Sequence, residues 1–277
     1  MRPGNDQIID EWLIIIIFEE ESNIIQEMKK CFLVIALSLS ALFMHAQVDT
    51  TRVLCVGNSF TYYFDSHLKL AEIALSQGHY IDMTAAYVGG YTFNRHLNDL
   101  KTIGAIEQFT KPYDCVFLQN QSQVHALYAQ NPKQHKLQKK DAVELVARVR
   151  QYSPDARIWL ESTWSYPAGN CGGFGTEAEF NRLMVKGTWM LAKAAHTAVS
   201  PIGEAFRISR EERPDIDLFS KDKKHQSAFG TYLKSCVNYL MIFGGRFNGD
   251  ASDCGLDPDS CAFLRSVAER VVASTKR

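Results

Sequence analysis

The chain has 277 residues, of which 46% are hydrophobic and 22% charged, with 30 basic and 31 acidic side chains. This composition is typical of a globular protein with a substantial core. Because no basic stripe with interleaved aromatic residues occurs, the sequence gives no electrostatic basis for a nucleic-acid partner.

The N-terminal segment differs from the rest of the chain. Residues 28–30 are Met-Lys-Lys, and the apolar residues 31–44 follow, a pattern typical of a secretory signal peptide cleaved after Ala46. The apolar stretch is shorter than the roughly 20 residues of a membrane span. We predict that residues 28–46 are a signal peptide and that residues 1–27 are a wrongly annotated upstream extension, the alternative being a short acidic helix or tail. The mature protein is then periplasmic or extracellular, with no membrane span.

Strand and helix patterns alternate from residue 51 onward. Short apolar runs predict strands at 53–56, 81–88, 113–118, 156–161 and 196–202. Helical periodicity predicts helices at 68–75, 93–109, 138–152, 176–195, 227–243 and 259–275, the second of them broken near Gly104. The alternation predicts one α/β domain over residues 50–277, a three-layer α/β/α sandwich with a five-stranded, mostly parallel sheet.

A serine follows the first predicted strand, which ends at Gly57-Asn58-Ser59. Glycine there frees the backbone for a tight turn. The carboxyl end of a strand is where ligands bind in open α/β sheets, and a helix that begins nearby directs its N–H groups to the same point. Ser59 is therefore a candidate nucleophile. The simpler interpretation is that Asn58 or Ser59 caps the next helix.

A candidate base lies far along the chain, at Asp222-x-x-His225. A serine nucleophile needs a base, and the base needs a partner that fixes its tautomer. Asp222 can reach back to the imidazole of His225 from the loop before the helix at 227–243. Alone, such a pair is more often a cap and a solvated histidine.

Two further residues at the same sheet edge compete for chemical roles. His96 follows the glycine pair at 89–90 and is an alternative base or a substrate contact, unless it packs against the sheet edge as an N–H donor. Glu161 ends the fourth strand and is an alternative acid, unless its carboxylate is solvated or bonded locally.

Six cysteines remain after residue 46. Cys55 and Cys115 lie in predicted strands, where a thiol behaves as a small hydrophobe. Cys254 and Cys261 close a loop rich in Asp and Gly and form a candidate disulfide for an exported protein. No Cys-x-x-Cys or His/Cys cluster supports a zinc site. Chemistry on Ser59 with His225 as base needs no metal and no cofactor, and we expect neither.

Several motifs together resemble the SGNH/GDSL-like hydrolase superfamily. They are GNSF at 57–60, GGYTFNRH at 89–96, LQNQSQ at 118–123 and HQSAFGTYL at 225–233, with Asp222 ahead of the last. The resemblance covers about residues 52–244. Within the superfamily, the motifs look most like those of an exported bacterial branch. It implies a flavodoxin-like sheet and an esterase or acylhydrolase activity.

The resemblance also implies roles for residues of this chain. Ser59 is the nucleophile, His225 the base and Asp222 the group that orients it. The oxyanion hole comprises the N–H groups of Ser59 and Gly90 and a side-chain amide from the loop after the third strand. That loop carries asparagine in the superfamily, and the amides in its place here are Gln123, at the expected position, and Gln121, nearer the strand.

The expected activity is that of an exported serine esterase that forms an acyl-enzyme on Ser59. The expected substrate is a small-molecule or carbohydrate ester, an acetyl ester on a carbohydrate above all, because many exported members of the superfamily deacetylate carbohydrates. We expect His96, Asn120 and Trp164 to contact it. The alternative is a carbohydrate-binding protein that uses the same fold without turnover.

Overall fold

The structure is a computed structural model. It describes residue 26 and residues 28–30, 49–108, 110–167, 169–249 and 251–275. Two compact units divide the chain, residues 1–48 and residues 49–277. The predicted signal peptide and upstream extension lie almost wholly outside the described residues, so both stay predictions. Within the described residues, no helix is long and apolar enough to cross a membrane.

The second unit is built on a five-stranded sheet, which confirms the predicted fold class. Its strands are β1 (Thr50–Gly57), β2 (Tyr80–Tyr87), β3 (Cys115–Leu118), β4 (Arg157–Glu161) and β5 (Ala198–Ser200). Their order is β2-β1-β3-β4-β5, and all four pairings are parallel. This is the flavodoxin-like order, in which ligands bind at the switch point between β1 and β3.

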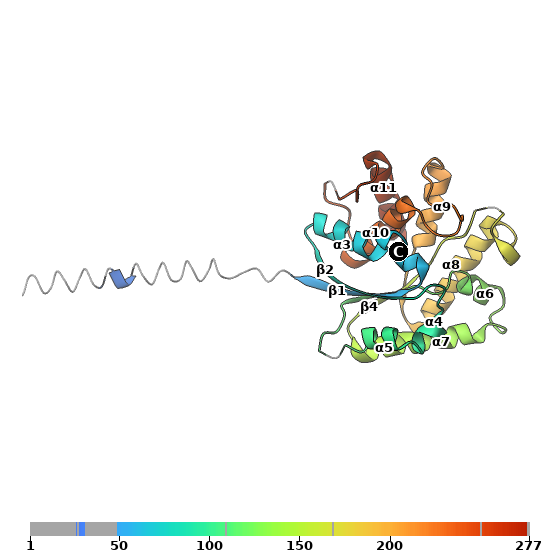
Figure 1. The fold of residues 1–277 in the computed structure, drawn as a ribbon, viewed down its shortest axis with the longest axis horizontal. Coiled ribbons are helices and arrows are strands. Elements are labelled where there is room, and N and C mark those ends of the chain that lie inside the picture. The colour runs from blue at the N-terminus through green and yellow to red at the C-terminus, as the bar shows by residue number, and fades with distance from the viewer. Residues whose placement is uncertain are drawn as a thin grey trace, which may run out of the picture. The chain divides into compact units, whose positions relative to one another are not determined.

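Helices cover both faces of this sheet (Figure 1). They are α2 (Ser59–Tyr62), α3 (Ser66–Ser76), α4 (Phe93–Leu97), α5 (Leu100–Ile106), α6 (Val124–Gln130), α7 (Lys136–Tyr152), α8 (Glu177–Ala195), α9 (Ile202–Glu212), α10 (Ala228–Phe243) and α11 (Pro258–Thr275), with short 3₁₀ turns at Tyr63–Asp65 and Gly172–Phe174. Helices α3, α9, α10 and α11 lie on one side, and α4, α5 and α7 lie on the other.

The three layers follow from the alternation of side chains along each strand. In β1, Val53 and Cys55 pack into the core beneath α3 and α10, whereas Leu54 and Val56 pack into the core beneath α4 and α7. Successive side chains of a strand point to opposite faces. Because both sets are apolar, both faces need a layer of helices, and the strand ends stay open at the edges of the sheet.

The predicted helix at 93–109 is two helices, and the predicted break near Gly104 is wrong. The helix α4 ends at Leu97, and α5 starts after Asp99, whose carboxylate accepts a hydrogen bond from the Thr102 N–H at 2.8 Å. A side-chain cap of this kind begins a new helix. Gly104 lies inside α5.

The sequence pattern missed the helices α6 and α9. Helix α6 has seven residues and follows a run of amides, so it is too short to show a period. Helix α9 carries Gly203 in its first turn, and glycine weakens the helical signal there. Glycine is required there because the start of α9 lies close to the chain after β4: a Cβ on Gly203 would lie 2.3 Å from the Thr163 carbonyl oxygen.

The candidate disulfide between Cys254 and Cys261 is not formed, and both residues are free thiols. The Cys261 Sγ donates instead to the Asp253 carbonyl at 3.7 Å. The loop is held by Arg265, whose guanidinium lies 2.5 Å from the Asp253 carboxylate. An ion pair therefore closes the loop that the sequence assigned to a disulfide.

A buried histidine makes the stability of the fold sensitive to acid. His125 lies 2.8 Å from the Thr188 hydroxyl, which itself donates to the Met184 carbonyl, so Nδ1 of His125 carries the proton. Its Nε2 is buried with no partner in the described residues. Burial lowers the pKa of His125 from its usual 6.5 to about 4.

We expect the contribution of His125 to the free energy of unfolding to be largest above pH 6.5 and to fall as the pH drops toward 4. The reason is that the unfolded chain binds the proton at a higher pH than the folded chain does. From pH 7 to pH 4.5 this histidine accounts for roughly 2 kcal/mol of that fall. Urea unfolding at both values should show a smaller loss in His125→Leu than in the wild type. Equal losses in the two proteins would contradict this assignment.

Candidate active site

The turn after β1 is held by a close approach to β3. A Cβ on Gly57 would lie 2.1 Å from Thr61 Oγ1 and 2.7 Å from Gln119 Oε1, so only glycine fits. The Gln119 Oε1 accepts hydrogen bonds from the Asn58 N–H at 2.8 Å and from the Thr61 hydroxyl at 3.1 Å. Gln119 is itself 1% exposed. The position of Ser59 is therefore fixed by a buried amide that directly follows the neighbouring strand β3.

Asn58 caps the short helix α2, as the simpler interpretation of the turn predicted. Its Oδ1 accepts a hydrogen bond from the Phe60 N–H at 3.2 Å. Its Nδ2 donates to the Tyr91 carbonyl at 3.1 Å, which ties the turn to the glycine loop after β2. The cap and the candidate nucleophile are thus neighbouring residues, and Ser59 is left free for another role.

The three residues predicted for a catalytic relay lie in contact. The Ser59 Oγ is 2.8 Å from Nε2 of His225, although the two residues are 166 positions apart. The Nδ1 of the same ring is 2.5 Å from Oδ2 of Asp222. The other carboxylate oxygen accepts the N–H groups of Lys224 and His225, each at 3.0 Å. Asp222 therefore fixes both the ring and the backbone of its own loop.

The charge on Asp222 sets the tautomer of the ring. Partial burial raises the pKa of this carboxyl. The hydrogen bonds from the His225 ring and from the Lys224 and His225 N–H groups lower it by more, so the pKa lies below its usual value. An ionised carboxylate only accepts, so Nδ1 of His225 carries the proton. The Nε2 is then the acceptor for the Ser59 hydroxyl.

Aromatic rings hold the imidazole in place. The His225 ring stacks on Tyr63 with centroids 4.1 Å apart and an angle of 10°. It meets Phe60 edge-on, with centroids 5.4 Å apart. Both aromatic residues come from the segment that begins at Ser59, so the nucleophile and the base share one packed unit.

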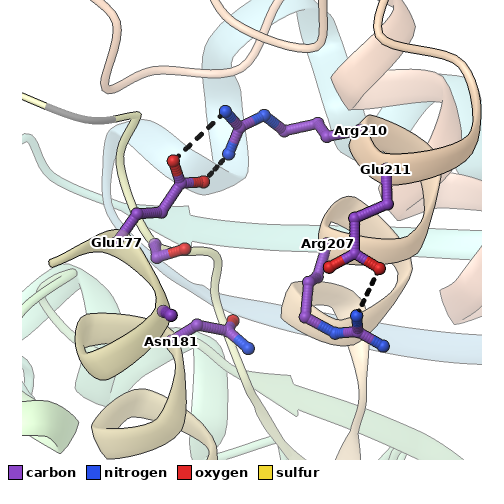
Figure 2. Close-up of a pocket in the computed structure, with 7 residues that line it drawn as sticks. Glu177, Asn181, Arg207, Arg210 and Glu211 are labelled. Carbon is purple, nitrogen blue, oxygen red and sulfur yellow. Dashed lines mark hydrogen bonds and ion pairs between the residues drawn. The ribbon is translucent and has the colours of Figure 1, made fainter.

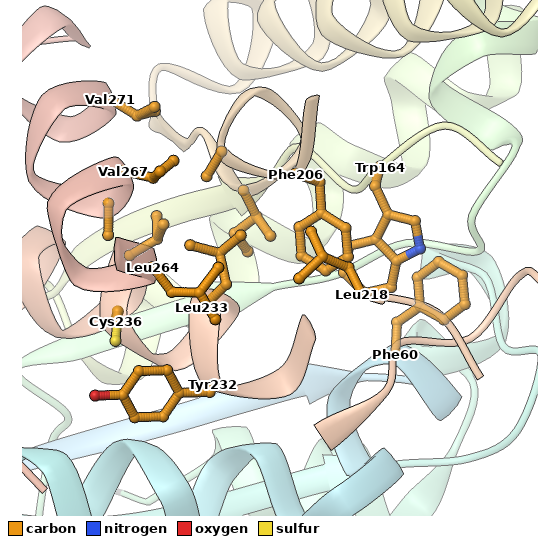
Figure 3. Packing of buried hydrophobic residues seen from close by; sticks show 14 of the residues in the cluster. Phe60, Trp164, Phe206, Leu218, Tyr232, Leu233, Cys236, Leu264, Val267 and Val271 are labelled. Carbon is orange, nitrogen blue, oxygen red and sulfur yellow. The ribbon is translucent and has the colours of Figure 1, made fainter. Parts of the chain in front are cut away.

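Trp164 is buried beneath this unit, and its predicted contact with substrate does not fit that placement. Its ring is 1% exposed and is sandwiched between Phe60, at 4.4 Å, and Phe206, at 4.2 Å (Figure 3). Its Nε1 donates to the Lys224 carbonyl at 2.9 Å. Trp164 therefore supports the loop of the candidate base from below, as part of the core.

A cavity of about 410 Å³ opens beside the Ser59 hydroxyl. It is lined mostly by polar groups: Asn58, Ser59, Phe60, Gly90, Gln121, Ser122, Gln123, Tyr166, Lys224 and His225. Gly90 has a φ of +70°, which glycine adopts without strain. Within the part of the chain that the structure describes, the N–H groups of Ser59 and Gly90 donate to no protein acceptor. Both are therefore open to an oxygen atom of a bound molecule.

The amide loop after β3 places two of its side chains at the cavity. Gln121 is oriented at both ends, because its Oε1 accepts from the Gln123 N–H at 3.0 Å and its Nε2 donates to the Ser122 hydroxyl at 3.3 Å. Gln123 lines the cavity without a side-chain cap bond to α6. Gln121 is thus the more rigid of the two candidate donors.

Asn120 does not line the cavity, so its predicted contact with substrate does not fit its place. It is 2% exposed, and its Oδ1 accepts the N–H groups of Phe93 at 3.1 Å and Gln121 at 2.9 Å. It joins the amide loop to α4 from beneath. The hydroxyl groups of Ser122 and Tyr166 hydrogen bond to each other in the cavity wall.

His96 is an internal residue that packs as an N–H donor, which is one of the alternatives that the sequence left open, and its burial does not fit the role of a base or of a substrate contact. It is 0% exposed, and its Nδ1 lies 2.9 Å from the Thr102 hydroxyl, which donates to Asp99. Burial lowers the pKa of His96 to about 4, so the ring is neutral near pH 7. Glu161 also lies inside the protein, in an ion pair with Lys234, and is not a second acid in the cavity.

A second cavity, of about 320 Å³, lies between α8 and α9 (Figure 2). Its charged side chains are paired with one another. Arg210 forms an ion pair with Glu177, and Arg207 lies 2.6 Å from Glu211. These four charged side chains are therefore already compensated by one another.

No protein-family model matches the chain, and no curated protein is significantly similar to it. Solved structures with the same architecture exist. A DUF4886 family protein from Bacteroides uniformis has a TM-score of 0.69 and 18% identity, over 83% of this chain and 97% of that one. A candidate SGNH hydrolase from Slackia heliotrinireducens has a TM-score of 0.56 and 20% identity, over 70% of this chain and 100% of that one. The chain has the SGNH hydrolase fold.

A candidate GDSL-like lipase from Parabacteroides merdae is also similar, with a TM-score of 0.50 and 15% identity over 70% of this chain and 95% of that one. At these identities the likeness establishes the SGNH hydrolase fold. A fold hosts many activities, so function has to be argued from the site itself.

The close approach at Gly57 predicts a sharp effect of one methyl group. In Gly57→Ala the new Cβ collides with Thr61 and Gln119, so the turn has to shift and Ser59 moves away from His225. We expect labelling of Ser59 by a fluorophosphonate to slow by about 100-fold, since a 1 Å misplacement costs that much. Gly104→Ala is the control, because its Cβ meets nothing within 4 Å. Equal labelling rates in all three proteins would contradict the argument.

Proposed function

We propose that the protein is an exported serine esterase that cleaves a carboxylic ester through an acyl-enzyme on Ser59. The observation that carries the proposal is the continuous relay from Asp222 through His225 to the Ser59 hydroxyl, with separations of 2.5 and 2.8 Å. A hydroxyl, an imidazole and a carboxylate in this order are the parts of a serine hydrolase. The relay faces a cavity with open N–H donors, which a bound ester needs.

The chemistry follows from the protonation states in the relay. As the Ser59 Oγ attacks the acyl carbon, Nε2 of His225 takes the hydroxyl proton, and Asp222 stabilises the imidazolium that forms. The imidazolium then gives the proton to the departing alcohol, which leaves the acyl group on Ser59. Water, deprotonated by the same Nε2, hydrolyses this ester and restores the free serine. Every step uses a group of this chain.

The oxyanion of the tetrahedral intermediate is assigned to three donors. They are the N–H groups of Ser59 and Gly90 and the side-chain amide of Gln121 or Gln123. Donors that are oriented before the reaction stabilise the charge without reorganisation. The two hydrogen bonds that fix the Gln121 amide favour it over Gln123.

The proposed substrate is a short acyl ester, with acetate on a carbohydrate as the leading case. A long acyl chain needs an apolar channel, whereas nearly all of the residues that line this cavity are polar. Amide and hydroxyl groups on the wall match the hydroxyl groups of a sugar. An exported enzyme of this kind would meet such esters outside the cytoplasm.

Removal of single members of the relay tests the proposal. With p-nitrophenyl acetate, we expect Ser59→Ala and His225→Ala to lower kcat by at least about 10³-fold. Asp222→Asn should lower it roughly 10²- to 10⁴-fold, because the ring loses its fixed tautomer. Ser266→Ala, at an exposed helix position, is the matched control. A carbohydrate-binding protein without turnover would show no difference between wild type and Ser59→Ala.

The two glutamines give a second test. We expect Gln121→Ala to lower kcat by about 10²-fold, the effect of losing one oxyanion donor. Gln123→Ala should change kcat less, since its side chain makes no cap hydrogen bond that would fix it to α6. Steady-state kinetics on p-nitrophenyl acetate measures both variants. If Gln123→Ala has the larger effect, the oxyanion donor is Gln123.

A further inference from the structure

We propose that the buried ion pair of Lys234 and Glu161 is a positioning pair, which fixes α2 and therefore holds Ser59 at the right distance from His225. This inference rests on the proposed esterase function. The pair lies outside the cavity wall and touches neither the relay nor a bound ester. It acts through the main chain of the residue that follows Ser59.

The contact that carries the proposal is the Phe60 carbonyl. Helix α2 ends at Tyr62, so this carbonyl has no partner from a continuing helix, and an unpaired buried carbonyl is costly. It accepts instead from the Lys234 ammonium at 3.0 Å and from the Gln226 side-chain amide at 3.1 Å. Gln226 is the neighbour of His225. The Phe60 carbonyl therefore joins the helix of the nucleophile to the segment of the base.

The ammonium of Lys234 is itself held by a network at the ends of two strands. It lies 2.5 Å from the Glu161 carboxylate, and the two side chains are 3% and 2% exposed. The other carboxylate oxygen accepts from Asn238 at 2.8 Å, one helical turn further along α10. The Asn238 Oδ1 accepts in turn from the Ser200 hydroxyl at 2.7 Å. The network thus ties α2 to the ends of the strands β4 and β5.

A net gain in stability does not account for such a pair. Taking two charges out of water costs several kcal/mol per ion, and replacing a buried pair by apolar side chains of similar size is often neutral or stabilising. A buried lysine also offers several directed donors, which an apolar side chain lacks. The specific effect of Lys234 at this place is to point one of those donors at the Phe60 carbonyl.

The test removes both charges together, so that no unpaired ion is left in the core. The double variant Glu161→Leu, Lys234→Met keeps the volume and loses the donor to Phe60. We expect it to fold, with a urea midpoint near that of the wild type. Its kcat for p-nitrophenyl acetate should fall by about 10- to 100-fold with KM nearly unchanged, because Ser59 is displaced while the cavity wall is intact.

The matched control is Asp253→Leu, Arg265→Met, which removes an ion pair of similar length that does not contact α2. It should keep the wild-type kcat. A folded Glu161→Leu, Lys234→Met protein with kcat within about twofold of wild type would overturn the proposal. Failure of that variant to fold would overturn it as well, because the pair would then hold the fold.

The rate of fluorophosphonate labelling at Ser59 separates this proposal from the proposed function. If the wild type hydrolyses no ester, the esterase function fails, and the labelling rate still reports the position of Ser59. Slower labelling in the double variant than in the wild type then supports the positioning pair, and equal labelling contradicts it. If the wild type is active and the double variant equals it in both assays, only the positioning pair fails.

Discussion

The candidate active site depends on one contact, the hydrogen bond from the Ser59 hydroxyl to Nε2 of His225. No local rule brings the end of β1 to a loop 166 residues away. The parallel sheet places Ser59 at its carboxyl edge, and the connection between α9 and α10 packs onto that edge. There the Lys224 carbonyl accepts from Trp164 at 2.9 Å, and the Gln226 amide donates to the Phe60 carbonyl at 3.1 Å. Two residues outside the cavity wall then set the geometry of this contact. Gln119 fixes the turn before Ser59, and Asp222 fixes the ring of His225.

Much of this arrangement could be predicted from the sequence, because the local signals agreed with the fold. The alternation of apolar runs gave all five strands, and the turn at Gly57 placed Ser59 at a strand end. The pair at Asp222 and His225 was visible through its spacing. Asn58 shows that two interpretations of one motif can both hold, since it caps α2 beside the serine that faces the base.

The errors have a common physical cause, which is that burial is set by tertiary packing. His96 and Trp164 lie close in sequence to the loops of the site, yet both are enclosed in the core. Asn120 is buried, whereas Gln121 and Gln123 line the cavity, and its Oδ1 accepts the N–H groups of Phe93 and Gln121. Lys234 carried no signal at all, since a lysine inside an apolar helix gives no indication of the carbonyl that it meets.

The central claim is that Ser59 becomes acylated during turnover, and rapid acid quench followed by peptide mass spectrometry measures this directly. After mixing with p-nitrophenyl acetate, the account predicts an acetyl group on Ser59 that appears within one turnover and then declines as substrate is exhausted. The same group should be absent from His225→Ala at the same times. Turnover by the wild type with no acetyl group on Ser59, or with the group on another side chain, would contradict the account.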